Sequence, residues 1–336
     1  MNTDTSEADD VIGSTSAAAT STGRVVDAEP PRPLHGQVAL VAGATRGAGR
    51  AIAVELARAG AYVYATGRSS RTQGRSEIDR PETIEETGEL IAAAGGEGIA
   101  LRVDHLDVGA VESLVARIAD ERGRLDVLVN DIFGGDRYAQ FGTSLWEHDV
   151  PGGLRMLRMG IDTHLITNAK ALPLLLEGER ALVIEMTDGT AEYNRAYREG
   201  VGFYYDLVKA AVGRITLGLT AELAQTAVTA LAVTPGWIRS EQMLDHFGVT
   251  EDTWRDAATG DLADFAISES PSYVARGIAA LAADPGVARY AGDTLTSAQL
   301  ARVYDVTDVD GSRPDCWRYL DEVQRHNRSG GIERYR

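Results

Sequence analysis

The chain has 336 residues, of which 44% are hydrophobic, so it can bury the core of one large α/β domain or of two small ones. An excess of acidic over basic side chains, 50 against 33, gives a net charge of −17 and argues against partners such as nucleic acids or anionic membrane surfaces. The single cysteine, Cys316, allows neither an internal disulfide nor a cysteine-rich metal site, and we expect no metal.

The first 33 residues are expected to form a disordered tail. They are rich in Ser, Thr, Ala and Asp and end in a cluster of prolines, a composition that buries too little surface to fold. This stretch lacks the basic start and apolar run of a secretory signal, and no apolar run in the chain approaches the roughly 20 residues of a membrane helix. We therefore expect a cytoplasmic protein with a folded domain over residues 34–300 and an irregular extension over 301–336.

The stretch at residues 37–59 organises the rest of the chain. Its apolar block, residues 38–41, is typical of a buried parallel strand, and a helical pattern of small apolar residues ends the stretch. Between them stand three glycines, Gly43, Gly47 and Gly49. Glycines let the backbone approach a diphosphate closely, and the amides at the start of the helix face its charge. Although a tight turn in any α/β protein would also explain the glycines, the order of strand, turn and helix favours a dinucleotide site.

Strands and helices continue to alternate after this stretch. Further strands are expected at residues 62–66, 98–103, 125–130, 181–186, 227–233 and 291–296. Further helices are expected at 81–94, 109–122, 151–177, 203–224, 240–258 and 271–283. This order predicts one doubly wound α/β domain, whose mainly parallel sheet is covered by helices on both faces.

Small or polar residues follow six of the predicted strands. They are Gly43 to Gly49, Gly67-Arg68, Asp104, Asn130, Thr187-Asp188 and Pro235-Gly236. Loops are polar in general, which explains each segment by itself but is a weaker explanation for all six segments together. Because ligands of such sheets bind beyond the carboxyl ends of the strands, the six segments predict one cleft for an extended cofactor.

Tyr205 and Lys209 stand four residues apart in a predicted helix and so share a face. A nearby ammonium favours the phenolate and would lower the pKa of the phenol from its usual value of about 10, which suits proton transfer near neutral pH. The spacing also occurs by chance in many helices, and Tyr204 could equally be the residue that packs. The pair gains weight from its place after the fifth strand of a nucleotide-binding sheet.

At this point the sequence resembles the short-chain dehydrogenase/reductase family over about residues 35–300. The resemblance rests on motifs in the family's order: Gly43-x-x-x-Gly47-x-Gly49, Asp104, the run from Leu125 to Asn130, Tyr205-x-x-x-Lys209 and Pro235-Gly236-Trp237-Ile238. It implies a single Rossmann-type domain with strand order 3-2-1-4-5-6-7, and hydride transfer between a nicotinamide dinucleotide and an alcohol or carbonyl carbon. It also implies a homodimer or homotetramer, formed through the helices at 151–177 and 203–224.

The resemblance further implies a role for individual residues. Tyr205 would be the catalytic acid and base, while Lys209 would hold the nicotinamide ribose and tune the tyrosine. Residues 235–238 would cover the nicotinamide, and Ser240 would contact its amide. The implied cofactor site comprises Gly43, Thr45, Arg46, Gly47, Ala48, Gly49, Arg68, Asp104 at the adenine, Asn130, Tyr205, Lys209, Pro235, Gly236 and Ile238.

The end of the second predicted strand indicates which dinucleotide binds. An acidic residue there would accept hydrogen bonds from the adenosine ribose and would reject a 2′-phosphate. Here Gly67 takes that place, Arg68 follows it, and Arg46 lies inside the glycine turn. Because two guanidinium groups suit a phosphate dianion, we favour NADP over NAD, although both arginines could also be solvated surface residues.

Three departures from the family pattern matter for the interpretation. Asp188 stands where the family has a serine, and Thr187 just before it would keep the hydroxyl chemistry if the loop shifted by one residue. An aspartate could donate a hydrogen bond only if its pKa were strongly raised. The family's helix asparagine falls on Gly160, and Asn130-Asp131-Ile132-Phe133 replaces the usual Asn-Asn-Ala-Gly. The sequence therefore supports cofactor binding better than catalysis, with His164 and Glu192 as side chains that could assist.

These features predict an NADP-dependent oxidoreductase that acts on a carbonyl or secondary alcohol of a small, apolar substrate. The missing serine and asparagine keep a second interpretation open, a sensor or scaffold that binds NADP without turnover. A methyltransferase shares the glycine turn but gives no reason for Tyr205 and Lys209. The substrate pocket is expected from loops at 133–150, 189–203 and 237–265, lined by Trp146, Trp237, Phe247 and Trp254.

Overall fold

The computed structural model describes residues 32–326 and 331–336, so the tail expected over residues 1–33 lies almost wholly outside the described residues. Seven parallel strands form one sheet in the order β3-β2-β1-β4-β5-β6-β7, which confirms the predicted Rossmann-type topology. The strands are β1 (Val38–Ala42), β2 (Tyr62–Gly67), β3 (Glu97–Arg102), β4 (Val127–Asn130), β5 (Ala181–Met186), β6 (Val228–Thr234) and β7 (Thr294–Thr296).

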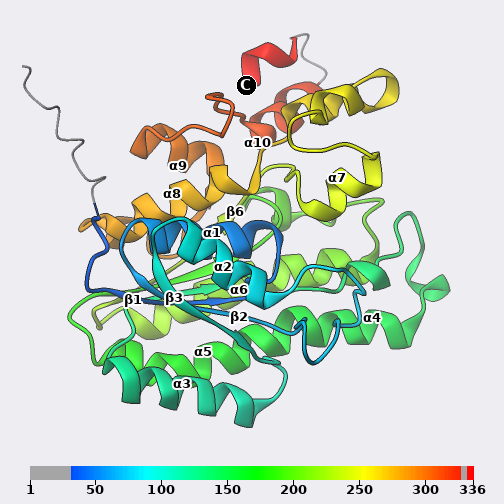
Figure 1. Cartoon of the computed structure of the whole chain (residues 1–336). Coiled ribbons are helices and arrows are strands. Elements are labelled where there is room, and N and C mark those ends of the chain that lie inside the picture. The colour runs from blue at the N-terminus through cyan, green and yellow to red at the C-terminus, as the bar shows by residue number, and fades with distance from the viewer. Residues whose placement is uncertain (1–31, 327–330) are drawn as a thin grey trace, which may run out of the picture. The chain divides into compact units, whose positions relative to one another are not determined.

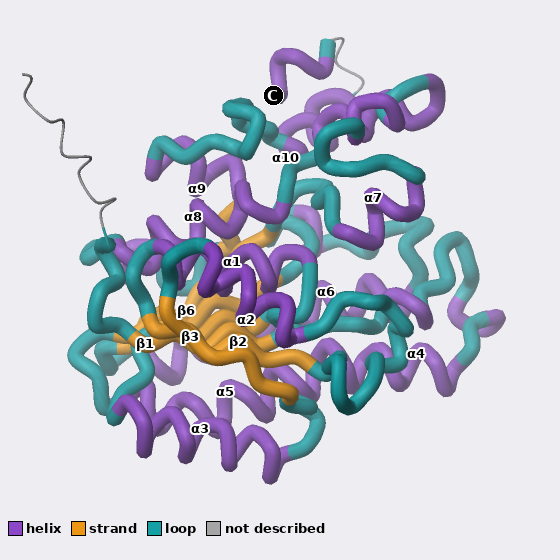
Figure 2. Tube along the Cα trace, viewed as in Figure 1, coloured by secondary structure: helices purple, strands orange, loops and turns teal. Residues whose placement is uncertain are grey.

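Helices cover both faces of this sheet (Figure 1). They are α1 (Gly47–Arg58), α2 (Ile84–Ala93), α3 (Val108–Arg122), α4 (Val150–Leu157), α5 (Thr163–Leu176), α6 (Phe203–Leu223), α7 (Glu241–Phe247), α8 (Pro271–Ala283), α9 (Ser297–Tyr304) and α10 (Cys316–Tyr319). In Figure 2 the strands form a layer between α1 and α2 on one side and α3 and α5 on the other. Within the described part of the chain, no helix combines the length and the apolar composition that crossing a bilayer requires.

The sequence of β1 shows why its strand is buried on both faces. All five residues are buried, as expected for a central parallel strand. Side chains alternate between the two faces, so Ala39 and Val41 join the core formed with α1 and α8, while Val38 and Leu40 join the core formed with α3 and α5. The buried strand therefore fixes the position of the glycine turn at the carboxyl end of the sheet.

The helix predicted at 151–177 contains a π-helical turn, Arg158–Asp162, between α4 and α5. Gly160 lies in this turn, where a Cβ atom would overlap the Val208 side chain of α6. The close contact between the π-helical turn and α6 therefore requires glycine at position 160. Such π-turns often lie at functional sites, and this one borders the cavity described below.

Two segments near the carboxyl end of the chain differ from the sequence-based expectation. The helix expected over 240–258 is the short α7, capped by the Ser240 hydroxyl and ended by Gly248, which has a φ of 65°. The stretch from residue 301, expected to be irregular, contains the end of α9, α10, a π-helical turn and a final 3₁₀ turn. Its apolar side chains Cys316, Tyr319 and Tyr335 are buried against Ile267, so it packs on the domain and carries α10 to the edge of the cavity.

Candidate active site

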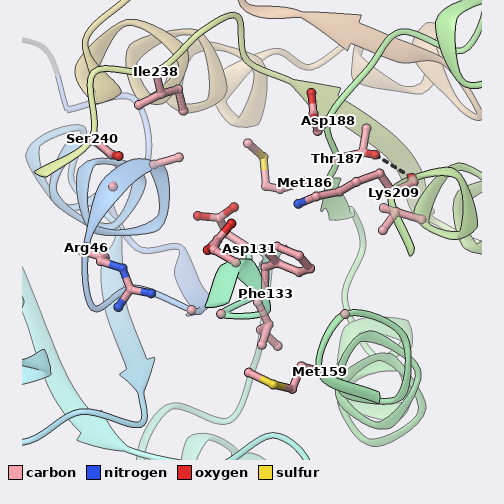
Figure 3. A pocket seen from close by; sticks show the side chains of 18 of the residues that line it. Arg46, Asp131, Phe133, Met159, Met186, Thr187, Asp188, Lys209, Ile238 and Ser240 are labelled. Atoms are coloured by element: carbon pink, nitrogen blue, oxygen red, sulfur yellow. Dashed lines mark hydrogen bonds between the residues drawn. The ribbon is translucent and has the colours of Figure 1, made fainter. Parts of the chain in front are cut away.

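A cavity of about 570 Å³ lies beyond the carboxyl ends of the strands, within the range of ligand pockets. It brings together most of the residues singled out from the sequence: Gly43, Thr45, Arg46, Gly47, Ala48, Arg68, Asp104, Thr187, Asp188, Tyr205, Lys209, Pro235, Gly236, Ile238 and Ser240. Gly49 and Asn130 are not part of its wall. Segments that are far apart in the sequence thus meet at one end of the sheet (Figure 3).

The glycine turn between β1 and α1 is held by close backbone contacts. Gly43 has a φ of 93°, and a Cβ atom on it would overlap the carbonyl oxygen of Asp131. A Cβ atom on Gly49 would overlap the carbonyl oxygen of Gly43. Both positions therefore require glycine for steric reasons, which is the close-packed backbone that a diphosphate site needs.

Two carboxylates lie at the start of α1, and the sequence did not reveal them. Glu241 accepts a hydrogen bond of 2.9 Å from the Gly47 amide, and Arg50 donates to the same carboxylate at 3.4 Å. Asp131 accepts from the Gly49 amide, and burial raises the pKa of Asp131 to about 6. The amides at the helix start are therefore already partly engaged by the protein's own acidic groups.

Arg46 and Arg68 line the same end of the cavity but differ in their partners. The Arg46 guanidinium is half-buried and makes no hydrogen bond or ion pair with any residue of 32–326 or 331–336, and burial lowers its pKa. Arg68 pairs with Glu77 at 2.8 Å. Hydrogen bonds from Arg155 foremost, and from Tyr138 and Arg68, lower the pKa of Glu77 to about 2. Arg46 is thus the cation without a direct partner in the described chain, although the charges of Asp136, Glu82 and Glu241 act on it.

Asn130 lies behind the wall of the cavity, fully buried in the end of β4. Its amide donates to Glu185 at 2.8 Å and to Asn168 at 3.2 Å. The residue thus contacts the polar interior beneath the site, where the resemblance implied contact with the cofactor. Asp104, by contrast, lines the cavity and accepts a hydrogen bond of 3.0 Å from the Leu106 amide.

His164 lines the floor of the cavity and is paired with Glu185. Its Nδ1 lies 2.5 Å from the Glu185 carboxylate, and its Nε2 lies 3.0 Å from the Ile132 carbonyl oxygen. Burial by itself would lower the pKa of His164, but the charge and hydrogen bond of Glu185 raise it overall. Glu185 escaped the sequence analysis because it sits inside an otherwise apolar strand, whereas the other suggested helper, Glu192, is exposed.

Tyr205 and Lys209 both face the cavity, as their spacing on α6 predicts, while Tyr204 packs in a small core against Met156. The Lys209 ammonium lies 3.7 Å from the centre of the Phe133 ring and 5.4 Å from the centre of the Tyr205 ring. The Tyr205 hydroxyl donates to Asp188 at 3.1 Å. Burial, followed by the charges of Asp188 and Asp136, raises the pKa of Tyr205 well above its usual value. The predicted lowering of this pKa by Lys209 was therefore wrong.

Thr187 and Asp188, which follow β5, have different hydrogen-bond partners. The Thr187 hydroxyl donates to the Lys209 carbonyl oxygen at 2.9 Å and is turned toward α6, as the dashed line in Figure 3 shows. Asp188 accepts hydrogen bonds from Tyr205 at 3.1 Å and from Arg198 at 3.3 Å. Asp188 therefore lies in the corner next to the tyrosine, and the loop does not shift to bring Thr187 there.

Comparison with known proteins identifies the family. The model of the short chain dehydrogenase family matches residues 37–248. The chain belongs to the short-chain dehydrogenase/reductase family. Dehydrogenase/reductase SDR family member 1 of Mus musculus is 32% identical over 286 residues, which cover 83% of this chain and 85% of the relative. NADPH-dependent aldehyde reductase 1, chloroplastic, of Arabidopsis thaliana is 28% identical over 211 residues, or 62% of this chain and 68% of the relative.

Solved structures share the fold of this short-chain dehydrogenase/reductase. A variant of the actinorhodin polyketide ketoreductase with NADPH has a TM-score of 0.62 at 24% identity, over 79% of this chain and 97% of the ketoreductase. The match to the family model ends at residue 248, but the cavity extends to Cys316, Trp317 and Leu320. This part of the wall therefore comes from a segment outside the family model.

Trp317 is a site residue that sequence reasoning missed. Its indole N–H donates to the Pro235 carbonyl oxygen at 2.7 Å, and its ring packs edge-on against Tyr193 at 5.2 Å. Of the four aromatic residues expected to line the pocket, only Trp237 does so among the described residues. Trp146 is 86% exposed, and Trp254 is buried outside the cavity. No spacing pattern pointed to Trp317, because only the folded extension brings it to the cavity.

Proposed function

We propose that this protein is an NADP-dependent oxidoreductase that transfers a hydride between NADP(H) and a carbonyl or secondary alcohol carbon of a small substrate. The observation that supports it best is the placement of two cations without an ion-pair partner in the described chain, Arg46 and Lys209, on opposite sides of one cavity (Figure 3). A dinucleotide is long enough to meet both, with its phosphates toward one and its nicotinamide ribose toward the other. Membership of the family supports the reaction class.

The residues around the cavity fit such a cofactor. The turn at Gly43 and Gly49 leaves no room for side chains, so the main chain itself forms the seat for a diphosphate. The segment from Pro235 to Ile238 also lines the cavity and would cover the nicotinamide. When bound, a reduced nicotinamide supplies the hydride, while Tyr205 exchanges a proton with the substrate oxygen and Lys209 holds the ribose.

Arg46 favours NADP over NAD. Its guanidinium is half-buried at the wall of the cavity without an anionic partner among the described residues, and a 2′-phosphate would supply one. Arg68 would assist, although it already shares Glu77 with Arg155. The names of two similar proteins, the NADPH-dependent aldehyde reductase and the ketoreductase with NADPH, agree with this choice.

Calorimetry with the four pyridine dinucleotides tests the cofactor assignment. We expect micromolar binding of NADPH and NADP⁺, and weaker binding of NADH and NAD⁺. A screen of small aldehydes and ketones with NADPH, followed by absorbance of the reduced cofactor, tests the reaction. Absence of heat with every dinucleotide would contradict the proposal as a whole.

The second candidate is a sensor or scaffold that binds NADP without turnover. It is favoured by Asp188, which offers a carboxylate where the family has a serine, and by Gly160, which has no side chain to support a proton relay. Tight binding of NADPH without turnover across the whole substrate screen would favour this candidate.

We also propose that the protein forms a homodimer or homotetramer through its long helices. Apolar side chains remain exposed on α4, α5 and α6, among them Leu154, Leu165 and Leu217, each about half exposed. Burial of such side chains between two copies is favourable. Light scattering at two protein concentrations would measure the assembly.

A further inference from the structure

Arg198, in the loop between β5 and α6, is buried next to the catalytic corner. It is only 9% exposed, and it contacts two carboxylates. Its guanidinium donates to Asp188 at 3.3 Å and to Asp206 at 3.3 Å, and its own amide also donates to Asp206 at 3.1 Å. Its guanidinium carbon lies 5.8 Å from the centre of the Tyr205 ring. The loop is thus folded so that one arginine bridges the aspartate beside the tyrosine and the first turn of α6.

This bridge bears on which groups take the place of the serine that the family has beside the tyrosine. Asp188 lines the cavity, and the charge of a second carboxylate in the cavity wall, Asp136, also acts on Tyr205. Acidic groups placed together repel one another unless a cation compensates them. The Lys209 ammonium lies over the Phe133 ring, so among the described residues Arg198 is the cation that bonds directly to Asp188.

We propose that Arg198 is a positioning residue of the active site. By pairing with Asp188 it fixes that carboxylate as the acceptor of the Tyr205 hydroxyl hydrogen, so that Asp188 and Arg198 together take the place of the family's serine and Tyr205 serves as a proton donor in carbonyl reduction. This inference rests on the proposed oxidoreductase function and adds to it a residue and a preferred protonation state.

The chemical step balances with one hydride from the reduced cofactor and one proton, which Tyr205 passes on and the solvent replaces. The carbonyl carbon gains the hydride with its electron pair, and the oxygen, which receives the electrons of the C=O double bond, takes the proton of Tyr205. The nicotinamide that gave the hydride is oxidised. The phenolate left on Tyr205 then takes up a proton from the solvent, because burial and the charges of Asp188 and Asp136 disfavour it and Arg198 only partly offsets them. Oxidation of an alcohol must begin from this disfavoured phenolate and therefore requires alkaline pH.

A double-mutant cycle tests the role of Arg198. With NADPH and the best carbonyl substrate of the screen, we expect Arg198→Gln to lower kcat about 30- to 100-fold, which is part of the roughly 10²- to 10⁴-fold that a positioned proton donor contributes. Arg195→Gln changes an exposed arginine of the same loop and serves as the control, with kcat unchanged. In an Asp188→Ser background, Arg198→Gln should lower kcat by less than about threefold, because the partner through which it acts is gone. An equal loss in both backgrounds would overturn the proposal.

A second variant distinguishes loss of the positive charge from a folding defect. Arg198→Lys keeps the positive charge beside Asp188 but loses the planar fork that reaches Asp206. We expect it to melt within a few degrees of the wild type and to retain about a third of its kcat or more. If Arg198→Lys folds normally yet is as inactive as Arg198→Gln, charge compensation of Asp188 is not the role of this residue.

Ionisation of Tyr205 gives a readout that does not depend on turnover. Tyrosine Cζ resonances of the ¹³C-labelled protein, assigned by comparison with Tyr205→Phe, report the phenolate directly. In the unliganded wild type, Tyr205 should stay protonated beyond about pH 10, the usual phenol value, and in Asp188→Ser it should ionise at lower pH. Identical titrations in the two proteins would overturn the inference. Failure of the proposed function would appear separately, as absence of heat with all four dinucleotides.

Discussion

The two ends of the cavity differ in the groups that determine their structure. At the glycine-turn end the main chain is closely packed, because a Cβ atom on Gly43 or Gly49 would overlap a carbonyl oxygen. At the catalytic end the wall consists of side chains, and the bonded set of Asp188, Arg198 and Tyr205 stands where the family has a serine beside the tyrosine. Steric limits on the main chain leave few alternatives, whereas a hydrogen-bond pattern can be rebuilt from other residue types. This difference explains why the glycines of the turn follow the family pattern, whereas the residue beside the tyrosine departs from it.

Both ends also contain carboxylates, with opposite consequences. At the start of α1, Asp131 and Glu241 accept hydrogen bonds from amides that would otherwise face an anion, so they would oppose binding of the proposed diphosphate. At the catalytic corner, Asp188 accepts the tyrosine's hydrogen and is compensated by Arg198. On the proposed function, the same chemical group would weaken cofactor binding at one end and would organise a proton donor at the other.

The largest expected effect is at the catalytic end, from Tyr205→Phe. Loss of the hydroxyl removes the proton donor, so kcat should fall about 1,000-fold or more. Because the ring and its contacts with Phe133 are kept, the Kd for NADPH should change less than about threefold. Stopped-flow turnover and calorimetry measure the two quantities. Turnover within about tenfold of the wild type would remove Tyr205 from the mechanism.

Restoring the family's asparagine at the π-turn should damage the protein. In Gly160→Asn the new Cβ atom would overlap the Val208 side chain, so the free energy of unfolding should fall by about 1–3 kcal/mol, as in other overpacked cores. Gly213→Asn, at a glycine of α6 with open space around its Cβ position, is the matched control and should cost less. Urea denaturation measures both. A stable Gly160→Asn variant with raised kcat would mean that the catalytic end has lost a relay and has not been rebuilt.

At the cofactor end, Arg46→Ala should discriminate between the two dinucleotides. Removal of a charge-assisted contact to the 2′-phosphate should weaken NADPH about 10- to 100-fold while leaving NADH nearly unchanged. Arg68→Ala should weaken NADPH less, because Arg68 is already partly neutralised by Glu77. Calorimetric titrations of both variants with both cofactors measure the difference. An equal loss for NADPH and NADH would remove Arg46 from phosphate recognition.

Much of the fold could be predicted from the sequence because its signals are local. The apolar block of β1 is buried on both faces, and the order of the strands follows from the family motifs. The spacing of Tyr205 and Lys209 placed both on the wall of the cavity. The strand order was implied by the resemblance to the family, whereas the other predictions use hydrophobic period, glycine positions and residue spacing, which act over a few residues.

The remainder of the site depends on contacts between distant segments. Glu241 reaches the Gly47 amide from 194 residues away, and Trp317 reaches Pro235 from 82 residues away. The pKa of Tyr205 was predicted in the wrong direction because the sequence shows Lys209 on the same helix but not the burial of the phenol or its bond to Asp188. Electrostatic environment is thus the property that was least accessible from the sequence.

The smallest effect is expected from Asp131→Asn, which would show whether the acidic groups at the start of α1 oppose the cofactor. Burial raises the pKa of Asp131 to about 6, although Lys209, the Gly49 amide, His164 and Arg46 favour its charged form. The wild type should therefore bind NADPH more weakly as the pH rises from about 5 to about 8, whereas the variant should lose this dependence and bind about 3- to 10-fold more tightly at the upper pH. Calorimetry at three pH values measures the change.

The same substitution should alter the pH dependence of stability, and the sign follows from proton binding. In the folded state Asp131 holds its proton up to about pH 6, above its usual range, so the wild type loses stability as the pH rises through this window. Asp131→Asn should flatten that slope. Glu241→Gln is the control, because it removes the other carboxylate at the helix start while leaving Asp131 to titrate. If the Kd for NADPH changed with pH in the same way in the wild type and in Asp131→Asn, the Asp131 carboxylate would not influence binding of the diphosphate. The raised pKa of Asp131 would then affect only the stability of the protein.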